Sequence, residues 1–109
     1  MKINTMLKTN FIVAAEIRRC ETMSIVATVN HKGDIDRGLL LIKHYVYGKG
    51  CKVYIQSRDL NDDLNWNNPL TDGWVDEAKA DHYIARQIKF DEDLWVLEVE
   101  DNKNTYAPI

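Results

Sequence analysis

Two segments of the chain repeat apolar residues at the spacing of an α-helix. In residues 6–23 most apolar side chains fall on one half of a helical wheel, and the polar ones fall mainly on the other half. In residues 76–90 the apolar stripe recurs every four residues, at Ala80, Ile84 and Ile88. Both patterns are typical of helices that bury one face, so the sequence predicts two amphipathic helices.

Four other segments have the composition of β-strands. They are rich in β-branched and aromatic residues and cover residues 24–30, 38–47, 51–56 and 94–99. The short turns between the first three segments indicate an antiparallel meander. The last segment is apolar at five of its six positions, which is typical of a strand covered on both faces. We therefore expect it at the centre of the sheet or next to the centre.

The order of the predicted elements is α-β-β-β-α-β, which indicates a single α+β domain. We expect one mixed sheet of four strands with both helices packed on one face. A right-handed crossover through the second helix would make the last strand parallel to the third strand and to the first. Residues 57–73 are rich in Asn and Asp and are predicted to form a polar loop, whereas residues 102–109 are predicted to form a frayed tail.

Composition and charge are those of a small globular protein. The chain has 109 residues, of which 45% are hydrophobic, and this is enough for one core. Its net charge of -3 is divided unevenly, because residues 1–60 hold ten basic and five acidic side chains and residues 61–109 hold four and twelve. This asymmetry fits a protein partner, nucleic acid or a homo-oligomer, and it also fits charge that only keeps the protein in solution.

The cysteines and the N-terminal residues bear on the compartment. Cys20 and Cys51 have no spacing typical of a disulfide framework or a metal site, so we expect reduced thiols. The first twenty residues show neither the apolar run nor the cleavage site of a signal peptide. No segment has the length and apolar character needed to cross a membrane. These features predict a cytoplasmic protein that does not contact a membrane.

The sequence contains no motif of a known catalytic, cofactor or metal site, and we predict none of these groups. His31, Asp34 and Asp36 surround a turn, and a metal site is one interpretation of this cluster. The favoured interpretation is that the aspartates make hydrogen bonds within the turn. Asp34 and Asp36 are nevertheless kept as candidates for functional carboxylates.

Glu98 is the third candidate carboxylate. It interrupts the apolar segment of residues 94–99, so its side chain needs either solvent or a cation. Lys43 and Arg37 are the cations that the predicted sheet offers. A structural ion pair is the favoured interpretation, and a functional carboxylate is the alternative.

Basic and aromatic residues alternate along the predicted hairpin of residues 43–58. The candidate binding residues in this hairpin are Lys43, Tyr45, Tyr47, Lys49 and Tyr54. If they face solvent, the rings could stack on bases and the lysines could contact phosphates. The alternative is that the tyrosines cover the edge of the core and the lysines keep the hairpin soluble. Trp66, in the polar loop, is a separate candidate for contact with a partner.

Blocks spread over nearly the whole chain match one protein family. They are residues 7–9 (LKT), 18–20 (RRC), 33–38 (GDIDRG), 41–43 (LIK), 74–78 (WVDEA) with Asp81 and, most specifically, 90–101 (FDEDLWVLEVED). On these blocks the chain resembles a small alphaproteobacterial family of unknown function, DUF1491. The resemblance implies a single-domain α+β protein, and it transfers no catalytic residues.

The lack of catalytic motifs, the uneven charge and the position of Trp66 favour a non-catalytic protein-binding or adaptor module. One alternative is a nucleic-acid-binding module that uses residues 43–58. The other is a small enzyme that uses Glu98 or the turn at Asp34 and Asp36.

Overall fold

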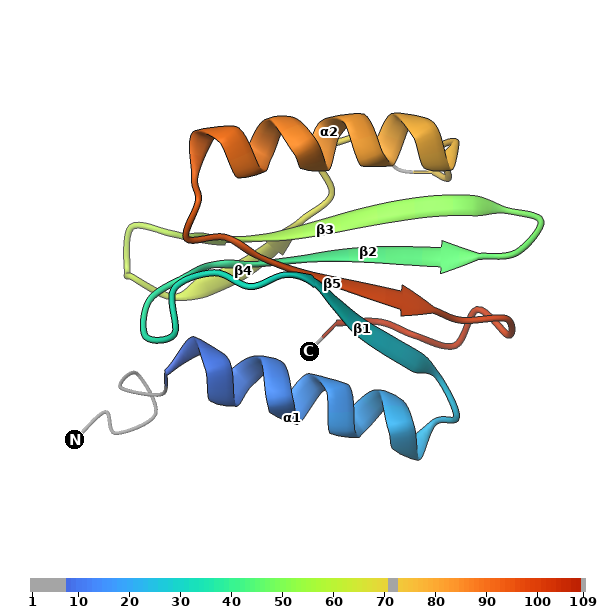
Figure 1. Ribbon diagram of the computed structural model, residues 1–109, viewed down its shortest axis with the longest axis horizontal. Helices are drawn as coiled ribbons and strands as arrows, with labels where there is room; N and C mark the ends of the chain where they lie inside the picture. The colour runs from blue at the N-terminus through green and yellow to red at the C-terminus, as the bar shows by residue number, and fades with distance from the viewer. Residues whose placement is uncertain (1–7, 71–72, 109) are drawn as a thin grey trace.

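The computed structural model describes residues 8–70 and 73–108 and shows a mixed β-sheet between two helices (Figure 1). The elements are α1 (Thr9–Thr22), β1 (Val26–His31), β2 (Leu40–Val46), β3 (Gly50–Arg58), β4 (Leu64–Asn67), α2 (Glu77–Phe90) and β5 (Trp95–Glu100). All six elements expected from the sequence are present, and β4 is an additional strand. Residues 6–7 of the first predicted helix, residues 71–72 of the predicted loop and residue 109 lie outside the described residues.

The strands lie in the order β1-β5-β2-β3-β4. β5 is parallel to β2 and antiparallel to β1, whereas β3 is antiparallel to both β2 and β4. β5 therefore lies next to the central strand, and its apolar residues are buried on both faces, which confirms the expectation for this segment.

Strand β4 lies within residues 57–73, where the sequence predicts only a loop. Its sequence LNWN places asparagine at every second position, and asparagine is uncommon in strands. The prediction of four strands is therefore wrong by one. The additional strand reverses the chain once more, so α2 connects β4 to β5. As a result, β5 runs antiparallel to β1 and β3, and the predicted parallel arrangement with those strands is also wrong.

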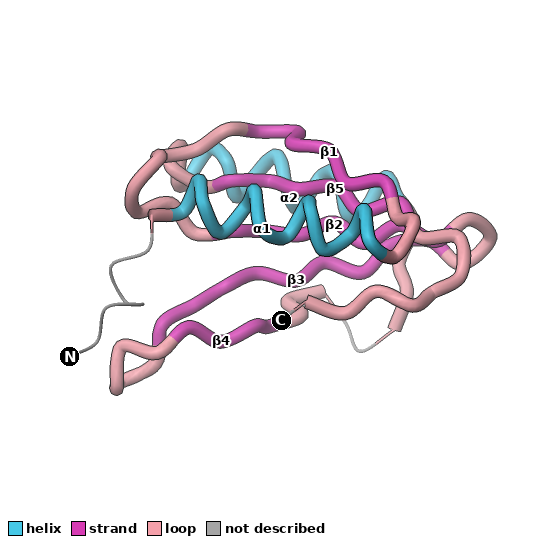
Figure 2. The backbone as a smooth tube through the Cα atoms, turned by 90° about the horizontal axis from the view of Figure 1, so that it is seen from below, coloured by secondary structure: helices cyan, strands magenta, loops and turns pink. Residues whose placement is uncertain are grey.

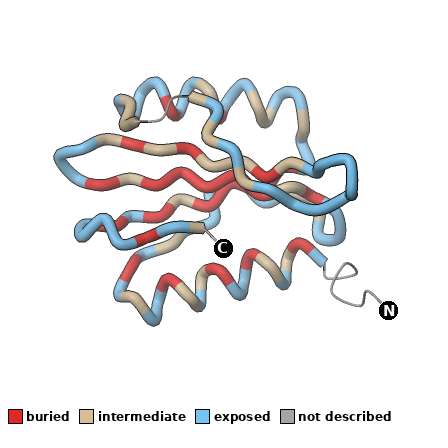
Figure 3. Tube along the Cα trace, turned by 180° about the vertical axis from the view of Figure 1, so that it is seen from behind, coloured by how far each residue is buried: buried red, intermediate tan, exposed pale blue. Residues whose placement is uncertain are grey.

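The two helices lie on opposite faces of the sheet, and the prediction that both pack on one face is wrong (Figure 1). Leu40 and Ile42 of β2 belong to the core cluster under α1, whereas Leu41 belongs to the cluster under α2. β5 divides its side chains in the same way, and burial is concentrated in these middle strands (Figure 3). Strands that are apolar on both faces need cover on both sides, because exposed apolar area is costly in water.

The turn between β1 and β2 ties the start of α1 to β5. Thr9 Oγ1 donates a hydrogen bond to the Gly38 carbonyl at 2.7 Å, and Trp95 Nε1 donates to the Asp34 carbonyl at 2.7 Å. Gly38 lies so close to the chain before β5 that an added Cβ would be 2.1 Å from the Asp93 carbonyl oxygen. Only glycine fits at this position.

The segment after β5 is anchored up to residue 106, so the predicted frayed tail is not observed there. Tyr106 is 5% exposed and packs in the core under α1. Its backbone N–H donates to Asp101 Oδ2 at 2.8 Å, and its hydroxyl donates to Glu16 of α1. The buried Tyr106 ring and these hydrogen bonds together fix the segment against α1.

Replacement of Gly38 by alanine is expected to lower the free energy of unfolding by more than about 2 kcal/mol, because the new methyl group would clash with the Asp93 carbonyl and the backbone would have to shift. Gly73→Ala is the matched control, because a Cβ there meets no atom within 4 Å. It should change stability by less than about 1 kcal/mol. Urea unfolding measures both variants, and a Gly38→Ala protein as stable as the wild type would disprove the close approach.

Candidate functional site

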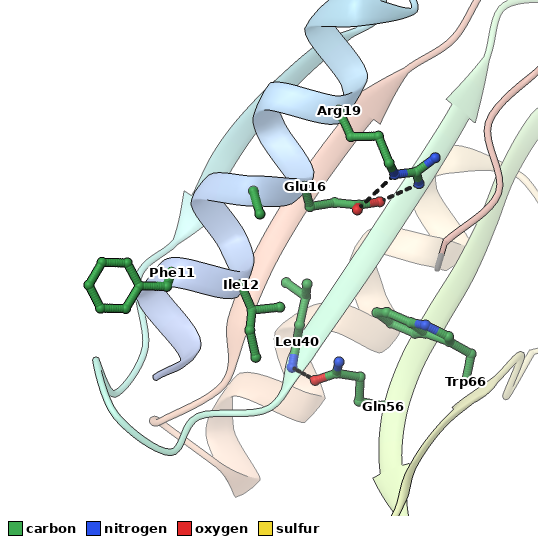
Figure 4. A pocket seen from close by; sticks show the side chains of 8 residues that line it. Phe11, Ile12, Glu16, Arg19, Leu40, Gln56 and Trp66 are labelled. Carbon is green, nitrogen blue, oxygen red and sulfur yellow. Dashed lines mark hydrogen bonds and ion pairs between the residues drawn. The ribbon is translucent and has the colours of Figure 1, made fainter. Parts of the chain in front are cut away.

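An open groove of about 750 Å³ lies between α1 and the strands β3 and β4 (Figure 4). Its walls are mostly apolar. The lining residues are Phe11, Ile12, Ala15, Glu16 and Arg19 of α1, with Leu40 of β2, Gln56 of β3 and Trp66 of β4. Apolar concavities of this volume with a few polar groups are typical of binding sites.

The groove exists because α1 covers only part of its face of the sheet. α1 packs on the side of β1, β5 and β2, and β3 and β4 extend beyond it (Figure 2). Gln56 is opposite Trp66 in the β3–β4 register, and Arg58 is opposite Leu64, so these four side chains share the face that α1 leaves open. The structure thus places the candidate Trp66, which is half-buried, in the wall of the groove.

One end of the groove carries a hydrogen-bonded cluster. Glu16 is 8% exposed, and its carboxylate accepts from Arg19 Nε at 3.1 Å, from Arg19 Nη2 at 2.7 Å and from the Tyr106 hydroxyl. Arg19 Nη2 also donates to the Ala107 carbonyl at 2.6 Å. The hydrogen bond to Glu16 raises the pKa of Arg19, and burial together with Glu16 raises the pKa of Tyr106. The guanidinium therefore stays charged, and the tyrosine hydroxyl stays a donor.

The carboxamide of Gln56 forms a second polar position in the groove. The residue is 8% exposed, and its Oε1 accepts the Leu40 N–H at 3.0 Å. This bond fixes the orientation of the carboxamide beside Ile12 and Leu40 (Figure 4). Among the described residues, the Gln56 Nε2 group has no hydrogen-bond partner.

Lys43 lies beneath α2, on the opposite face of the sheet. Its side chain is 4% exposed, and Nζ lies 2.7 Å from Glu77, 2.8 Å from Asp81 and 3.9 Å from Glu98. Burial lowers the pKa of Lys43, but the hydrogen bonds to Asp81 and Glu77 raise it by more, and the net shift is upward. The structure therefore contains the Glu98 ion pair that the sequence favours, and it adds two carboxylates from the start of α2.

The other candidates from the hairpin of residues 43–58 do not gather on one surface. Tyr45 faces the cluster under α2, whereas Tyr54 packs against the cluster under α1. Tyr47 is 81% exposed and lies beside the turn that contains exposed Lys49. Nucleic-acid binding through these residues stays a prediction, and the hairpin presents no continuous basic and aromatic face for it.

The aspartates of the first turn have structural contacts. Asp34 Oδ1 accepts the Asp36 N–H at 2.7 Å, and the exposed Asp36 carboxylate lies 3.6 Å from Lys8 Nζ. His31 Nδ1 lies 2.7 Å from the Leu94 carbonyl, to which it can donate. Across residues 8–70 and 73–108, no three His, Cys, Asp or Glu side chains are grouped to hold a metal ion.

The buried pair of His44 and Asp101 is not predicted from the sequence. Both side chains are 1% exposed, and His44 Nε2 lies 2.9 Å from Asp101 Oδ2 among the rings of Tyr54, Trp74 and Tyr106. Burial lowers the pKa of His44 and outweighs Asp101. Burial raises the pKa of Asp101, but hydrogen bonds from Tyr106 N–H and His44 lower it by more. The pair is therefore a neutral imidazole that donates to a carboxylate. Its one sequence signal is a histidine at an apolar position of a strand.

The two cysteines lie outside the groove. Cys20 and Cys51 are buried and free, and burial raises the pKa of each thiol to about 11. Thiols of this kind are poor nucleophiles at neutral pH. Neither α1 nor α2 has the length and apolar character that a membrane-spanning helix requires.

Comparison with known proteins identifies the family. The sequence profile described as "Protein of unknown function (DUF1491)" matches residues 7–107. The chain belongs to this family. The resemblance inferred from the sequence blocks is thereby confirmed, and the description of DUF1491 assigns no activity. No curated protein matches the sequence significantly.

Solved structures, two of them of DUF1491 proteins, have the same fold. A crystal structure from Caulobacter crescentus CB15 is 32% identical, with a TM-score of 0.78, and the match covers 87% of this chain and 88% of that chain. An NMR structure of a family protein from the same organism is also 32% identical, with a TM-score of 0.79 and coverage of 90% and 88%. A solution structure from A. tumefaciens is 23% identical, with a TM-score of 0.77 and coverage of 90% and 88%, and supports the fold alone.

The His44 pair predicts a pH dependence of stability. The pKa of His44 in the folded protein lies below its ordinary value of 6.5, so the unfolded chain takes up a proton that the folded chain excludes. The resulting stability is present above pH 6.5 and is lost as the pH falls below it, by up to about 1.4 kcal/mol per pH unit. His44→Gln keeps a donor for Asp101 but should lose this slope. Urea unfolding between neutral and mildly acidic pH tests this, and equal slopes in both proteins would refute it.

The Lys43 cluster predicts a large effect of removing two carboxylates together. In Glu77→Gln/Asp81→Asn the buried ammonium keeps only Glu98, at 3.9 Å. Because both lost partners are about half exposed, the expected loss is about 2–3 kcal/mol, below the full cost of an unpaired buried charge. A further Lys43→Met change should restore most of the stability. Urea unfolding gives the free energy of unfolding of the wild type, the double variant and the triple variant, and exposed Glu92→Gln is the control. A double variant as stable as this control would contradict the role of the cluster.

Proposed function

We propose that the protein is a non-catalytic module that binds a partner protein, and that the groove between α1 and β4 takes an amphipathic helix of that partner. The observation that carries this proposal is that α1 leaves part of its face of the sheet uncovered, and that this region forms a mostly apolar groove. Two buried, free cysteines fit a reducing compartment, which supports the cytoplasmic location expected from the sequence.

The width of the sheet explains why a helix fits. Five strands about 4.8 Å apart make a sheet about 19 Å wide, and neighbouring helices pack about 8–10 Å apart. Each face therefore has room for two helices and carries one. On the face of α1 the second place lies over β3 and β4 (Figure 2). The segment around Tyr106 covers one end of this part of the sheet, and the groove lies over the remainder.

The uncovered region on the opposite face has a different character. It lies over β1 and β5, where Thr28 and Asn30 are exposed and Asn30 Nδ2 donates to Glu98 Oε1 at 2.7 Å. Val26 is its apolar exception. A polar surface of this kind is stable in water without a partner, whereas a concave apolar surface is typical of a binding site. The groove that contains Trp66 is therefore the region that a partner would cover.

The chemistry of the groove supports binding rather than catalysis. Its ionisable groups, Glu16 and Arg19, pair with each other, and Glu16 also accepts from Tyr106. These three hydrogen bonds hold the Glu16 carboxylate in a structural ion pair, whereas a general base must reach the proton that it takes from the substrate. The groove instead offers apolar contact area with two polar positions, which is the composition of helix-binding grooves.

Two alanines of α1 provide a matched test. Ala15 and Ala14 are both exposed, but only Ala15 lines the groove. Tagged wild-type, Ala15→Arg and Ala14→Arg proteins are used to capture partners from a nuclease-treated native lysate, and the bound proteins are quantified by mass spectrometry. We expect the wild type and Ala14→Arg to recover the same partner, and Ala15→Arg to lose it by tenfold or more, on the order of the loss from blocking an interface centre.

Thermal unfolding checks that the two arginine variants are equally stable, because both substitutions lie on the exposed surface of one helix. Equal recovery by Ala14→Arg and Ala15→Arg would exclude the groove as the binding site. Loss of all partners in the nuclease-treated lysate, but not in an untreated one, would favour nucleic-acid binding instead.

A further inference from the structure

We infer that the helix bound in the groove is acidic, with a carboxylate that pairs with Arg19 and a second oxygen acceptor that meets Gln56. The inference rests on the proposed function and specifies the chemistry of the partner. It is carried by two donor groups that line the groove and whose remaining N–H bonds meet no acceptor among the residues that the structure describes.

Gln56 is the first of these groups. Its residue is more than nine-tenths buried, and its Oε1 is already used by the Leu40 N–H. The carboxamide therefore cannot rotate to exchange oxygen and nitrogen without losing that bond. Its NH2 group lines the groove, and the described residues offer it no acceptor. The buried side-chain atoms of the described residues that lack a hydrogen-bond partner do not include Gln56 Nε2, so this NH2 group opens onto the solvent in the groove, where a ligand can supply an acceptor.

Arg19 is the second group. Its Nε and Nη2 atoms donate to Glu16 and to the Ala107 carbonyl, which fixes the guanidinium at the end of the groove. Its Nη1 atom makes no hydrogen bond within residues 8–70 and 73–108. Figure 4 shows that Arg19 and Glu16 extend from α1 toward the strands that carry Gln56 and Trp66. The free N–H bonds of Nη1 are therefore held ready for an anion.

The groove offers a ligand donors rather than acceptors. Both oxygens of Glu16 accept hydrogen bonds from Arg19, and one of them also accepts from Tyr106. A carboxylate is the acceptor that an arginine binds most strongly. A helix that contacts the groove along its length has its backbone carbonyls paired internally. The acceptors that it offers therefore come from its side chains. An aspartate or glutamate within an otherwise apolar helix face is the chemistry that matches this groove.

The geometry of α1 sets the spacing of the partner residues. Ile12, beside Gln56, and Arg19 are seven residues apart on α1 (Figure 4). At 1.5 Å per residue this separation is about 10.5 Å, or two helical turns. A partner helix packed along α1 therefore needs its acidic residue and its second acceptor at i and i+7, with large apolar residues at i+3 and i+4 between them.

Synthetic peptides test this inference. The probe is a capped peptide of about sixteen residues, long enough for appreciable helicity in water, with Glu at i, Leu at i+3 and i+4, Gln at i+7 and a neutral background. The control peptide has Gln in place of Glu at i. Both peptides are also made with the residues at i and i+7 exchanged. Calorimetry with the full-length protein should show that the Glu peptide binds about tenfold more tightly than the Gln peptide, and that added salt reduces the difference.

Protein variants locate the effect. Arg19→Gln should abolish the preference for the Glu peptide, whereas Arg18→Gln, an exposed neighbour that does not line the groove, should keep it. Glu16→Gln/Arg19→Gln is measured in parallel because it leaves no unpaired buried carboxylate. Gln56→Glu keeps the acceptor for Leu40 but replaces the free donor by an oxygen, so a peptide with Glu at both i and i+7 should bind this variant about tenfold more weakly than it binds the wild type.

The outcomes separate the two proposals. Equal binding of the Glu and Gln peptides to the wild type, lost in Ala15→Arg, would overturn the acidic partner and leave the groove as a helix site. Loss of the preference in Arg18→Gln as well would also overturn it. Dodecanoate, a small amphiphile, is titrated as a third probe. Binding of dodecanoate but of neither peptide would overturn both proposals in favour of a small amphiphilic ligand, and binding of none of the three probes would also count against both.

Discussion

The fold depends on burying the adjacent parallel strands β2 and β5 on both of their faces. Leu40, Leu41 and Ile42 follow one another in β2 and are all buried, and β5 has a similar run. No single layer of helices can cover such strands, so α1 and α2 take opposite faces. Lys43 interrupts the run in β2, and it is accommodated because α2 begins with carboxylates that reach its ammonium group.

Much of this architecture can be predicted from the sequence, and the errors have physical causes. The helices and four strands follow from their apolar periodicity, and the Glu98–Lys43 pair follows from a charge placed in an apolar strand. β4 is missed because its asparagines hide the alternation of Leu64 and Trp66. The placement of both helices on one face ignores the unbroken apolar runs, which already require two layers.

The groove could not be predicted in the same way, because no local pattern encodes it. Ile12, Gln56 and Trp66 come from α1, β3 and β4, and they meet only when the strand order is known. Trp66 alone is marked by the sequence, as a large apolar residue in a polar segment. The uneven cover of the sheet, with one helix per face and a different half exposed on each, turns these scattered residues into a surface.

The hydrogen bond between Tyr106 and Glu16 joins residues ninety positions apart in sequence. Arg19 likewise holds the Ala107 carbonyl, so one end of the groove is built from both ends of the described chain. A nascent chain therefore cannot assemble this end of the groove until residues 101–107 have left the ribosome. A proteolytic fragment that lacks this segment cannot assemble it either, so the shape of the groove depends on residues 101–107 being present and folded.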